Sequence, residues 1–505
     1  QFWLVDANAA DNRSNILAEA VSLGISNGPP ILHDAAQVVA RSYGATRAPE
    51  AIAVNTANLQ VFYRGAIDDR LSSNAVATTQ HYLSNALVKF LAGGVVSPSR
   101  TLPAGCDVTY RPRYTNLTYS GDIAPMLISR CVRCHSPGNI APWDMTSHAV
   151  IQDYAPSIRD SVVNGHMPPW TADPNYGVFT NDASLTPGEL AKLVQWIDDG
   201  AQKGVLEPDP LATLPVVTNY PYAWPSELGT PAGILRIPNQ SIPATGTVGY
   251  RYITVTNTLF STSVWLRAAV VRPGNTRVVH HALVLEGDAN QSLGGLAGFF
   301  AGYVPGFDAT PFPPNTGKRM LPGQVYTFQM HYTTAGTAQT DQTEIAFYLA
   351  PTPPAYALQT KSAYSVTFSI PANNRDYTST AYFPSSGTLT TNIMLYEMSP
   401  HMHLRGSRFT YDVTYPNGTR EVLLSVPNYI FHWQALYRLA TPKYLPKGSR
   451  IRCVAGWDNT AQNEHLTEEY QASGDSRYLP SSSVGFGEQS YQEMFIGYLN
   501  YAEVP

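Results

Sequence analysis

The segments VVHHALVL (residues 278–285) and VYTFQMHY (residues 325–332) decide the fold of the second half of this chain. Each is a short run rich in β-branched and aromatic residues, which is typical of a strand buried in a sheet. Comparable runs occupy residues 250–255 and 451–457, and Pro, Gly and Asn turns separate them. The chain from about residue 214 onward is therefore predicted to be β-rich.

Two successive all-β, jelly-roll-like sandwiches are the natural architecture for these strands. We expect them over residues 213–352 and 353–505, with a hinge at Pro351–Pro354. Both carry candidate copper ligands, namely His280, His281, His331, His401, His403 and Met494. Imidazole binds copper well and a thioether favours Cu(I). A site of three histidines and a site of two histidines with a methionine therefore both suit a copper ion that changes oxidation state.

Strand geometry affects the histidine pairs differently. His280 and His281 are neighbours, so in a regular strand their rings point to opposite faces and a shared ion requires a twist or a β-bulge. His401 and His403 are two residues apart and share one face of a strand. An isolated histidine in a β-protein is usually an ordinary core or surface residue, and His432 and His465 are interpreted in that way.

Taken together, these motifs resemble the type II copper monooxygenases, the family of peptidylglycine α-hydroxylating monooxygenase and dopamine β-monooxygenase. The matching stretches are Val278–Leu283 for the His-His motif, Gln329–Tyr332 for Gln-x-His-Tyr, His401–Gly406 for His-x-His, and Glu493–Met494 with Tyr498 for the methionine motif. The resemblance covers roughly residues 214–505. It implies a first copper, which stores an electron, at His280, His281 and His331.

The resemblance further implies a second copper, at which oxygen is activated, at His401, His403 and Met494. It also places Gln329 and Tyr498 in the catalytic site. The implied reaction is hydroxylation of an aliphatic C–H bond: one atom of O2 enters the substrate, the other becomes water, and two electrons come from outside. In this family the two coppers lie on facing halves with a solvent-filled cleft between them.

The chain departs from the peptide-amidating members of that family at the substrate clamp. Ser399 and Ile496 stand where those members carry an Arg and an Asn that help to bind a peptide carboxylate, and only Tyr498 of the clamp remains. Losing a charge-assisted anchor makes a peptide C-terminus a poor substrate. We therefore expect a small or apolar substrate together with O2. The disulfides of the family are also missing.

The sequence CVRCH (residues 131–135) predicts one covalently attached haem c, with thioethers to Cys131 and Cys134 and with His135 beneath the iron. A redox pair or half of a zinc site is disfavoured because a histidine follows directly and no second Cys pair occurs. Met167 is favoured as the sixth ligand because Met/His is the common cytochrome c pair, while His166 and His148 remain alternatives. Such a haem has no open position and transfers electrons.

Residues 119–170 resemble small bacterial cytochrome c domains, so an all-α domain is expected over residues 106–212, with a helix from Glu189 to Gly200. Thioether attachment of haem implies an exported protein, periplasmic or extracellular. A tethered cytochrome raises the local concentration of reductant. The haem is therefore expected to relay electrons to the first copper from an exported donor, either a cytochrome or a small reductant.

Residues 1–105 alternate strand and helix patterns, which indicates an α/β domain. Helices are expected at 12–23, 37–43 and 82–91, and strands at 2–5, 52–54 and 59–63. The stretches 43–50 and 63–68 resemble the later part of a thioredoxin or peroxiredoxin, with Pro49 at the cis-proline position of that family. The redox Cys-x-x-Cys of the family would precede Gln1. A docking or structural role without thiol chemistry is therefore expected.

Composition narrows the class of protein. Of the 505 residues only 14% are charged, against roughly 25% in an average protein, and 31 Tyr, 40 Pro and 37 Gly indicate a loop-rich exported chain. The net charge of −5 and the lack of a basic stripe argue against nucleic-acid binding. No run approaches the ~20 apolar residues of a transmembrane helix. Cys106 and Cys453 form no disulfide framework, and each is expected to be a buried thiol.

The sequence thus favours an exported monooxygenase that contains copper and haem c. The alternative is a non-catalytic electron-transfer or assembly protein that uses the sandwiches as a scaffold, since low charge permits chains to pack into a homo-oligomer. An open copper position at His401, His403 and Met494 would separate the two. Copper storage is a third alternative, although a storage protein would carry more clustered Met and Cys.

Overall fold

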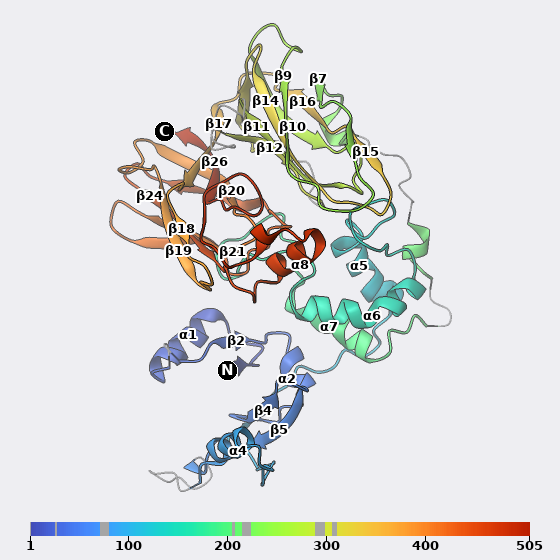
Figure 1. Ribbon diagram of the computed structural model, residues 1–505, viewed down its shortest axis with the longest axis vertical. Coiled ribbons are helices and arrows are strands. Elements are labelled where there is room, and N and C mark those ends of the chain that lie inside the picture. Colours follow the sequence, from blue (N-terminus) through green and yellow to red (C-terminus); the bar gives the residue numbers. More distant parts are fainter. Residues whose placement is uncertain are drawn as a thin grey trace. The chain divides into compact units, whose positions relative to one another are not determined.

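The computed structural model describes residues 2–25, 28–70, 80–204, 208–214, 224–287, 298–305 and 311–505. It is mostly β-sheet with few helices, which confirms the β-rich prediction (Figure 1). The chain divides into two compact units, Gln1–Thr118 with Leu185–Gln202, and Tyr119–Ser184 with Lys203–Pro505. The expected boundary near residue 213 adjoins residues 215–223, which lie outside the described residues.

The first unit contains short strands and helices near the expected positions. Its elements are β1 (Leu4–Asp6), α1 (Arg13–Ser22), β2 (Ile31–His33), α2 (Val38–Ser42), β3 (Arg47–Ala48), β4 (Ala51–Asn55), β5 (Gln60–Gly65), α4 (Tyr82–Leu91), β6 (Cys106–Asp107) and α7 (Pro187–Asp198). Asn12 caps α1 through its side chain, and Thr186 and Glu189 form a capping box on α7. The β1–β2 pair is parallel and β4–β5 is an antiparallel hairpin.

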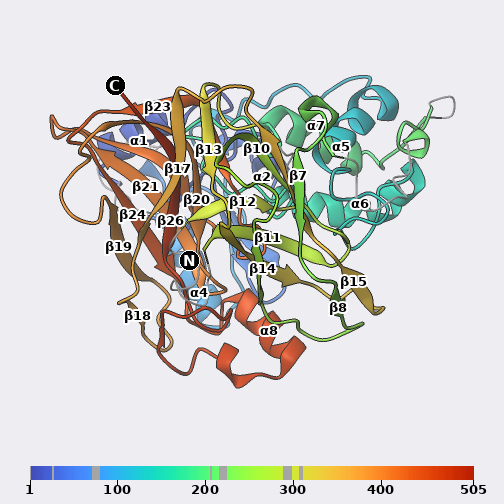
Figure 2. The same cartoon turned by 90° about the horizontal axis from the view of Figure 1, so that it is seen from above.

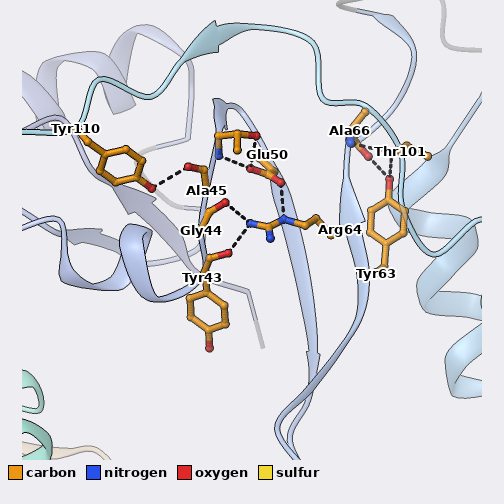
Figure 3. A network of polar contacts seen from close by, with 10 residues as sticks. Tyr43, Gly44, Ala45, Glu50, Tyr63, Arg64, Ala66, Thr101 and Tyr110 are labelled. Carbon is orange, nitrogen blue, oxygen red and sulfur yellow. Dashed lines mark hydrogen bonds and ion pairs between the residues drawn. The ribbon is translucent and has the colours of Figure 1, made fainter. Parts of the chain in front are cut away.

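Arg64 on β5 joins the hairpin to the segment before β4 (Figure 3). Its Nε donates to Glu50 Oε1 at 2.7 Å, and its Nη2 donates to the carbonyl oxygens of Tyr43 and Gly44. Burial alone would raise the pKa of Glu50, but hydrogen bonds from the Thr46 main chain and from Arg64 outweigh it and lower that pKa. This ion pair holds the turn that leads into Pro49, whose peptide bond with Ala48 is cis.

The two cysteines outside the haem motif differ in environment. Cys453 on β24 is fully buried, as expected, and burial raises its pKa. The expectation of a buried thiol is wrong for Cys106, which is exposed. The reason is that β6 has only two residues, both exposed, and lies with β3 in a two-stranded sheet.

The second unit begins with helices and continues as sheets. Its helices are α5 (Ala124–Arg130), α6 (His148–Val163) and α8 (Glu464–Ser473). Its strands are β7 (Gly233–Arg236), β8 (Gln240–Ile242), β9 (Arg251–Thr256), β10 (Val264–Arg272), β11 (Val279–Glu286), β12 (Phe299–Tyr303), β13 (Thr316–Met320), β14 (Val325–Tyr332), β15 (Gln339–Asp341), β16 (Glu344–Leu349), β17 (Tyr356–Tyr364), β18 (Ser369–Ile370), β19 (Tyr377–Phe383), β20 (Asn392–His401), β21 (Gly406–Thr414), β22 (Arg420–Val426), β23 (Tyr437–Leu445), β24 (Arg450–Trp457), β25 (Val484–Gly485) and β26 (Ile496–Val504).

Eight of the described strands form one sheet in the order β23-β20-β26-β17-β13-β10-β16-β7. Several of them, among them β17, β13 and β10, are labelled in Figure 2. One end of this sheet packs its apolar face on the sheet β12-β11-β14-β9, and the other end packs on β19-β24-β21-β22. The parallel pairing of β13 with β17 joins the two ends. The β-region therefore consists of two sandwiches that share one sheet.

The segment after α6 belongs to the core of the second sandwich. Trp170, Phe179 and Ala183 are buried among residues of β20 to β24, and Trp170 lies 4.9 Å from Tyr437 between ring centroids. The main-chain nitrogen of Thr180 donates to the carbonyl oxygen of Arg438 at 2.9 Å. Over the described residues, no helix combines the length and the apolar character needed to cross a membrane.

Candidate metal centres

The first candidate centre lies where β11 pairs with β14. His280 and His281 come from β11 and His331 from β14, and one ring nitrogen of each lies within 4.8 Å of the others. The register of the strand pair shifts between Val279 and His281. This irregularity is the β-bulge that two neighbouring histidines require in order to reach one ion.

Burial keeps these three imidazoles neutral. It lowers the pKa of His280 to about 3 and the pKa values of His281 and His331 well below the usual value, and repulsion from neighbouring histidines, including His432, adds to the effect. The Nδ1 atoms of His280 and His281 are 3.2 Å apart. His331 Nδ1 is buried and has no hydrogen-bond partner among the described residues. A metal ion bound to this donor set would satisfy that nitrogen, and neutral imidazole is the form that binds metals.

The second candidate centre lies at the end of β20. His401 Nδ1 is 2.6 Å from Gln434 Oε1, and His403 Nδ1 is 3.1 Å from the carbonyl oxygen of Gln492. Each oxygen can only accept, so each Nδ1 carries the proton and each Nε2 keeps a free electron pair. This is how metal-binding histidines are usually held. Burial lowers the pKa of His401 to about 4 and that of His403 to about 3.

Glu493 holds the histidine turn against the segment that carries Met494. Its carboxylate accepts hydrogen bonds from the main-chain nitrogens of His403, at 2.8 Å, and Arg405, at 2.6 Å, and from Trp457 Nε1 at 3.0 Å. Burial raises the pKa of Glu493 to about 7, although Arg405 and these donors lower it. Met494 is fully buried, and His401 pairs with Ile496 two residues further on. The methionine therefore lies at the same end of the sheet as both histidines.

Two aromatic side chains contact both histidine groups. The Tyr250 ring centroid is 4.9 Å from His331 and 6.4 Å from His403, and its hydroxyl is 3.4 Å from His281 Nε2. The Phe431 ring lies 5.9 Å from His331 and 5.7 Å from His403. The family resemblance implied a solvent-filled cleft between the two copper ions. In this chain the rings of Tyr250 and Phe431 lie next to both histidine groups.

A cavity of about 480 Å³ opens beside the second centre. His401, Gln434, Ser399 and Tyr498 line one side, and apolar residues of β10, β11 and β12 line the other. Ser399 and Tyr498 face each other in the β20–β26 register. The volume falls within the range of roughly 300–1,000 Å³ that small-molecule sites occupy.

Part of the cavity wall is charged but internally paired. Glu397 accepts from Arg438 Nε at 2.8 Å and from Asn500 Nδ2 at 2.7 Å. Arg133 of the haem motif also lines the cavity. Glu397 and Arg438 neutralise each other, whereas Arg133 and Asp182 add further charged groups to the lining, so the cavity has an apolar wall and a polar rim.

Gln329 is buried on β14, on the face that carries His331. Its Nε2 donates to Tyr252 Oη at 2.8 Å, and its Oε1 has no hydrogen-bond partner among the described residues. The side chain does not line the cavity as described, whereas Tyr498 does. Gln329 is therefore placed next to the first centre.

The predicted haem motif follows α5. Cys131 and Cys134 lie in the turn after this helix and are not joined by a disulfide, as far as the described residues show. His135 is buried and its Nδ1 is 3.0 Å from the carbonyl oxygen of Trp143, which leaves Nε2 for a ligand. Burial lowers the pKa of His135, so the ring is neutral. Two thiols and an oriented imidazole fit a covalent haem.

The sixth-ligand candidates lie after α6. Met167 is half-buried and His166 is exposed, while His148 packs edge-on against Tyr119 with ring centroids 4.8 Å apart. Met167 therefore stays the favoured prediction. The haem-motif loop also contacts the strand region of the first centre, because Thr276 Oγ1 donates to the carbonyl oxygen of Gly138 at 3.0 Å.

The interpretation of His432 and His465 as ordinary residues is incomplete. With Glu468 they form another group whose ligand atoms lie within 4.8 Å of one another. The sequence showed only two isolated histidines, because α8 and the loop before β23 meet through packing. Gln434, Arg405 and Glu493 were likewise missed as supports of the second centre. The available signals were the two charged residues inside the quoted motifs, Arg405 after the histidine pair and Glu493 before Met494.

Comparisons with known proteins place this chain in no family. No family model and no curated protein matches it. Among solved structures, the VP2 subviral particle of infectious bursal disease virus is 13% identical, covers 56% of this chain and 83% of its own, and has a TM-score of 0.15. The T=1 particle derived from infectious bursal virus is 10% identical, covers 52% of this chain and 65% of its own, and has a TM-score of 0.16. Similarity at this level carries no argument about fold or function.

Proposed function

We propose that this chain is an exported monooxygenase that contains copper and haem c and hydroxylates an aliphatic C–H bond with O2. The observation that carries the proposal is the second candidate centre. Two buried, neutral histidines there have their Nδ1 atoms fixed by oxygen acceptors, and His401 borders a cavity large enough for a small substrate. The first centre and the haem motif support a redox reaction rather than hydrolysis.

The donor sets assign the residues that would hold each group. His280, His281 and His331 would hold one copper ion, and His401, His403 and Met494 would hold the other. When bound, copper supplies one-electron redox chemistry and oxygen activation, by which one oxygen atom enters the substrate and the other leaves as water. Haem held by Cys131, Cys134 and His135 supplies electron transfer from an exported cytochrome or small reductant.

The protein's own residues provide orientation and exclude water. Gln434 and the Gln492 carbonyl fix the two rings of the second centre, and Glu493 fixes the turn between them. The apolar side of the cavity would hold the reacting part of the substrate near His401, with Ser399 and Tyr498 opposite each other at its edge. A small, mostly apolar substrate suits this lining better than a peptide carboxylate.

Metal analysis of the full chain tests the proposal first. We expect one iron and two copper ions per chain, and copper-dependent O2 consumption with an oxygenated product from small apolar compounds. After rapid mixing, reduced haem should be reoxidised when copper(II) is loaded, and a haem that stays reduced would contradict the electron relay. A chain that binds no copper at His401 and His403 would contradict the proposal and favour the scaffold function.

Replacing Gln434 by leucine should weaken copper binding at the second centre by about 10–100-fold, because the oxygen that accepts from His401 Nδ1 is lost. Competition with a chelator of known affinity measures the change. Gln462→Leu, at an exposed position, is the matched control and should bind copper as the wild type does. Equal affinities in both variants would show that Gln434 does not orient the ring.

A further inference from the structure

We propose that His432, His465 and Glu468 form a further metal site, which takes a divalent ion of the zinc type. This site lies outside the residues assigned to copper and haem. It does not depend on the proposed reaction.

The ligand atoms are close to the spacing that a zinc ion requires. His465 Nδ1 and Glu468 Oε2 are 3.7 Å apart, and the His432 and His465 rings meet edge-on with centroids 5.6 Å apart. Bonds of ~2.0–2.1 Å around a tetrahedral ion place ligand atoms roughly 3.3 Å from one another. His465 Nδ1 has no hydrogen-bond partner among the described residues, so a bound ion would take its electron pair.

The backbone on the α8 side of the site is fixed. His465 and Glu468 are three residues apart on α8 (red in Figure 1) and so share one face of the helix. Asn463 caps α8 and also donates from Nδ2 to the carbonyl oxygens of Leu404 at 3.1 Å and Asp458 at 2.9 Å. Leu466 is buried in the core of the second sandwich. Hydrogen bonds and core packing therefore fix the position of α8, and with it the backbone of both ligands.

The loop that carries His432 is fixed as well. Phe431, its neighbour, is buried in the same core, and the main-chain nitrogen of Tyr429 donates to the carbonyl oxygen of Ser407 at 2.8 Å. A site built from two anchored segments loses little freedom when it binds an ion, which favours affinity.

Two imidazoles and one carboxylate are a ligand set that zinc accepts while keeping a fourth position open. The Glu468 side chain is 68% exposed, so solvent reaches that position. The ion would tie α8 to the loop that carries Phe431, which contacts both candidate copper centres, and Gln434, which holds His401. Its expected role is to stabilise that loop.

The main competitor is the first copper centre, because the His432 ring lies 5.5 Å from His280. If His432 turned toward His280, the three side chains would not act together on one ion. Variants on α8 separate the two arrangements, since His465 and Glu468 belong only to the proposed site.

The test titrates haem-loaded full-length protein, loaded anaerobically with two equivalents of Cu(I) per chain, with Zn2+ against a chromophoric chelator. We expect the wild type to bind one more Zn2+ than His465→Ala, and Glu468→Gln to bind that ion at least about 10-fold more weakly. Glu464→Gln, exposed on the same helix, is the control and should match the wild type. Because the result is a difference of one ion between chains, it stands whether or not the copper centres load.

Equal Zn2+ stoichiometry in the wild type, in His465→Ala and in Glu468→Gln would overturn the proposal. So would a loss of copper, rather than of zinc, in His465→Ala, because His465 would then support the first copper centre. The Glu468→Gln variant should fold normally, because the Glu468 side chain is mostly exposed. A loss of Zn2+ in this variant therefore cannot be attributed to misfolding.

Discussion

Replacing His403 by alanine is expected to lower product formation more than about 100-fold and to remove one of the two copper ions. A direct ligand should matter more than the outer hydrogen-bond partners of a metal, which usually contribute about 10–100-fold. The loss would be local, because Glu493 bonds to the main-chain nitrogen of residue 403, which the variant keeps. Copper analysis together with O2 uptake and product detection measures both effects.

His33→Ala is the control for this variant. His33 is an exposed histidine on β2 in the first unit, so its removal should leave copper content and turnover unchanged. The first centre of the His403 variant should still bind copper, because its ligands come from β11 and β14. Wild-type turnover in His403→Ala would mean that the reaction takes place elsewhere.

Replacing Glu493 by alanine is expected to destabilise the second unit by about 3 kcal/mol or more, because each buried donor that loses its acceptor costs roughly 1–3 kcal/mol. The fully buried Arg405 would lose its nearby counter-charge, and three donors would lose their acceptor: the main-chain nitrogens of His403 and Arg405, and Trp457 Nε1. Denaturant unfolding followed by Trp fluorescence measures the free energy of unfolding.

The matched control is Glu503→Ala, an exposed carboxylate near the end of β26, for which a change within about 0.5 kcal/mol is expected. Glu493→Gln should lie between the two, because the amide keeps one acceptor oxygen but not the charge. An unfolding free energy in Glu493→Ala equal to that of the control would show that the carboxylate does not hold the turn.

Local patterns in the sequence located the elements that carry the strongest periodic signal. Alternating and β-branched runs located β9, β11, β14 and β24 to within one residue, because burial on a pleated surface leaves that signature. The α7 helix begins at Pro187 rather than Glu189, since Thr186 caps it and a proline is favoured in the first turn. The need for an irregularity at His280–His281 also followed from strand geometry alone.

Long-range packing was beyond the sequence. Nothing local indicates that β13 pairs with β17 and thereby joins the two sandwiches, or that Leu185–Gln202 groups with the first unit. Gln434 lies 33 residues from His401, in a loop whose path depends on the core beneath it. The His432–His465–Glu468 group depends on the same packing.

The burial of Trp170, Phe179 and Ala183 in the core of the second sandwich has a consequence for modularity. The stretch that follows the candidate haem ligand Met167 supplies side chains to the β-core, so the cytochrome-like part is not an appendage on a linker. Removing residues 1–184 would leave apolar side chains along β23 without their packing partners. The two parts therefore share one core, and the segment after Met167 cannot be removed without uncovering apolar side chains of β20 to β24.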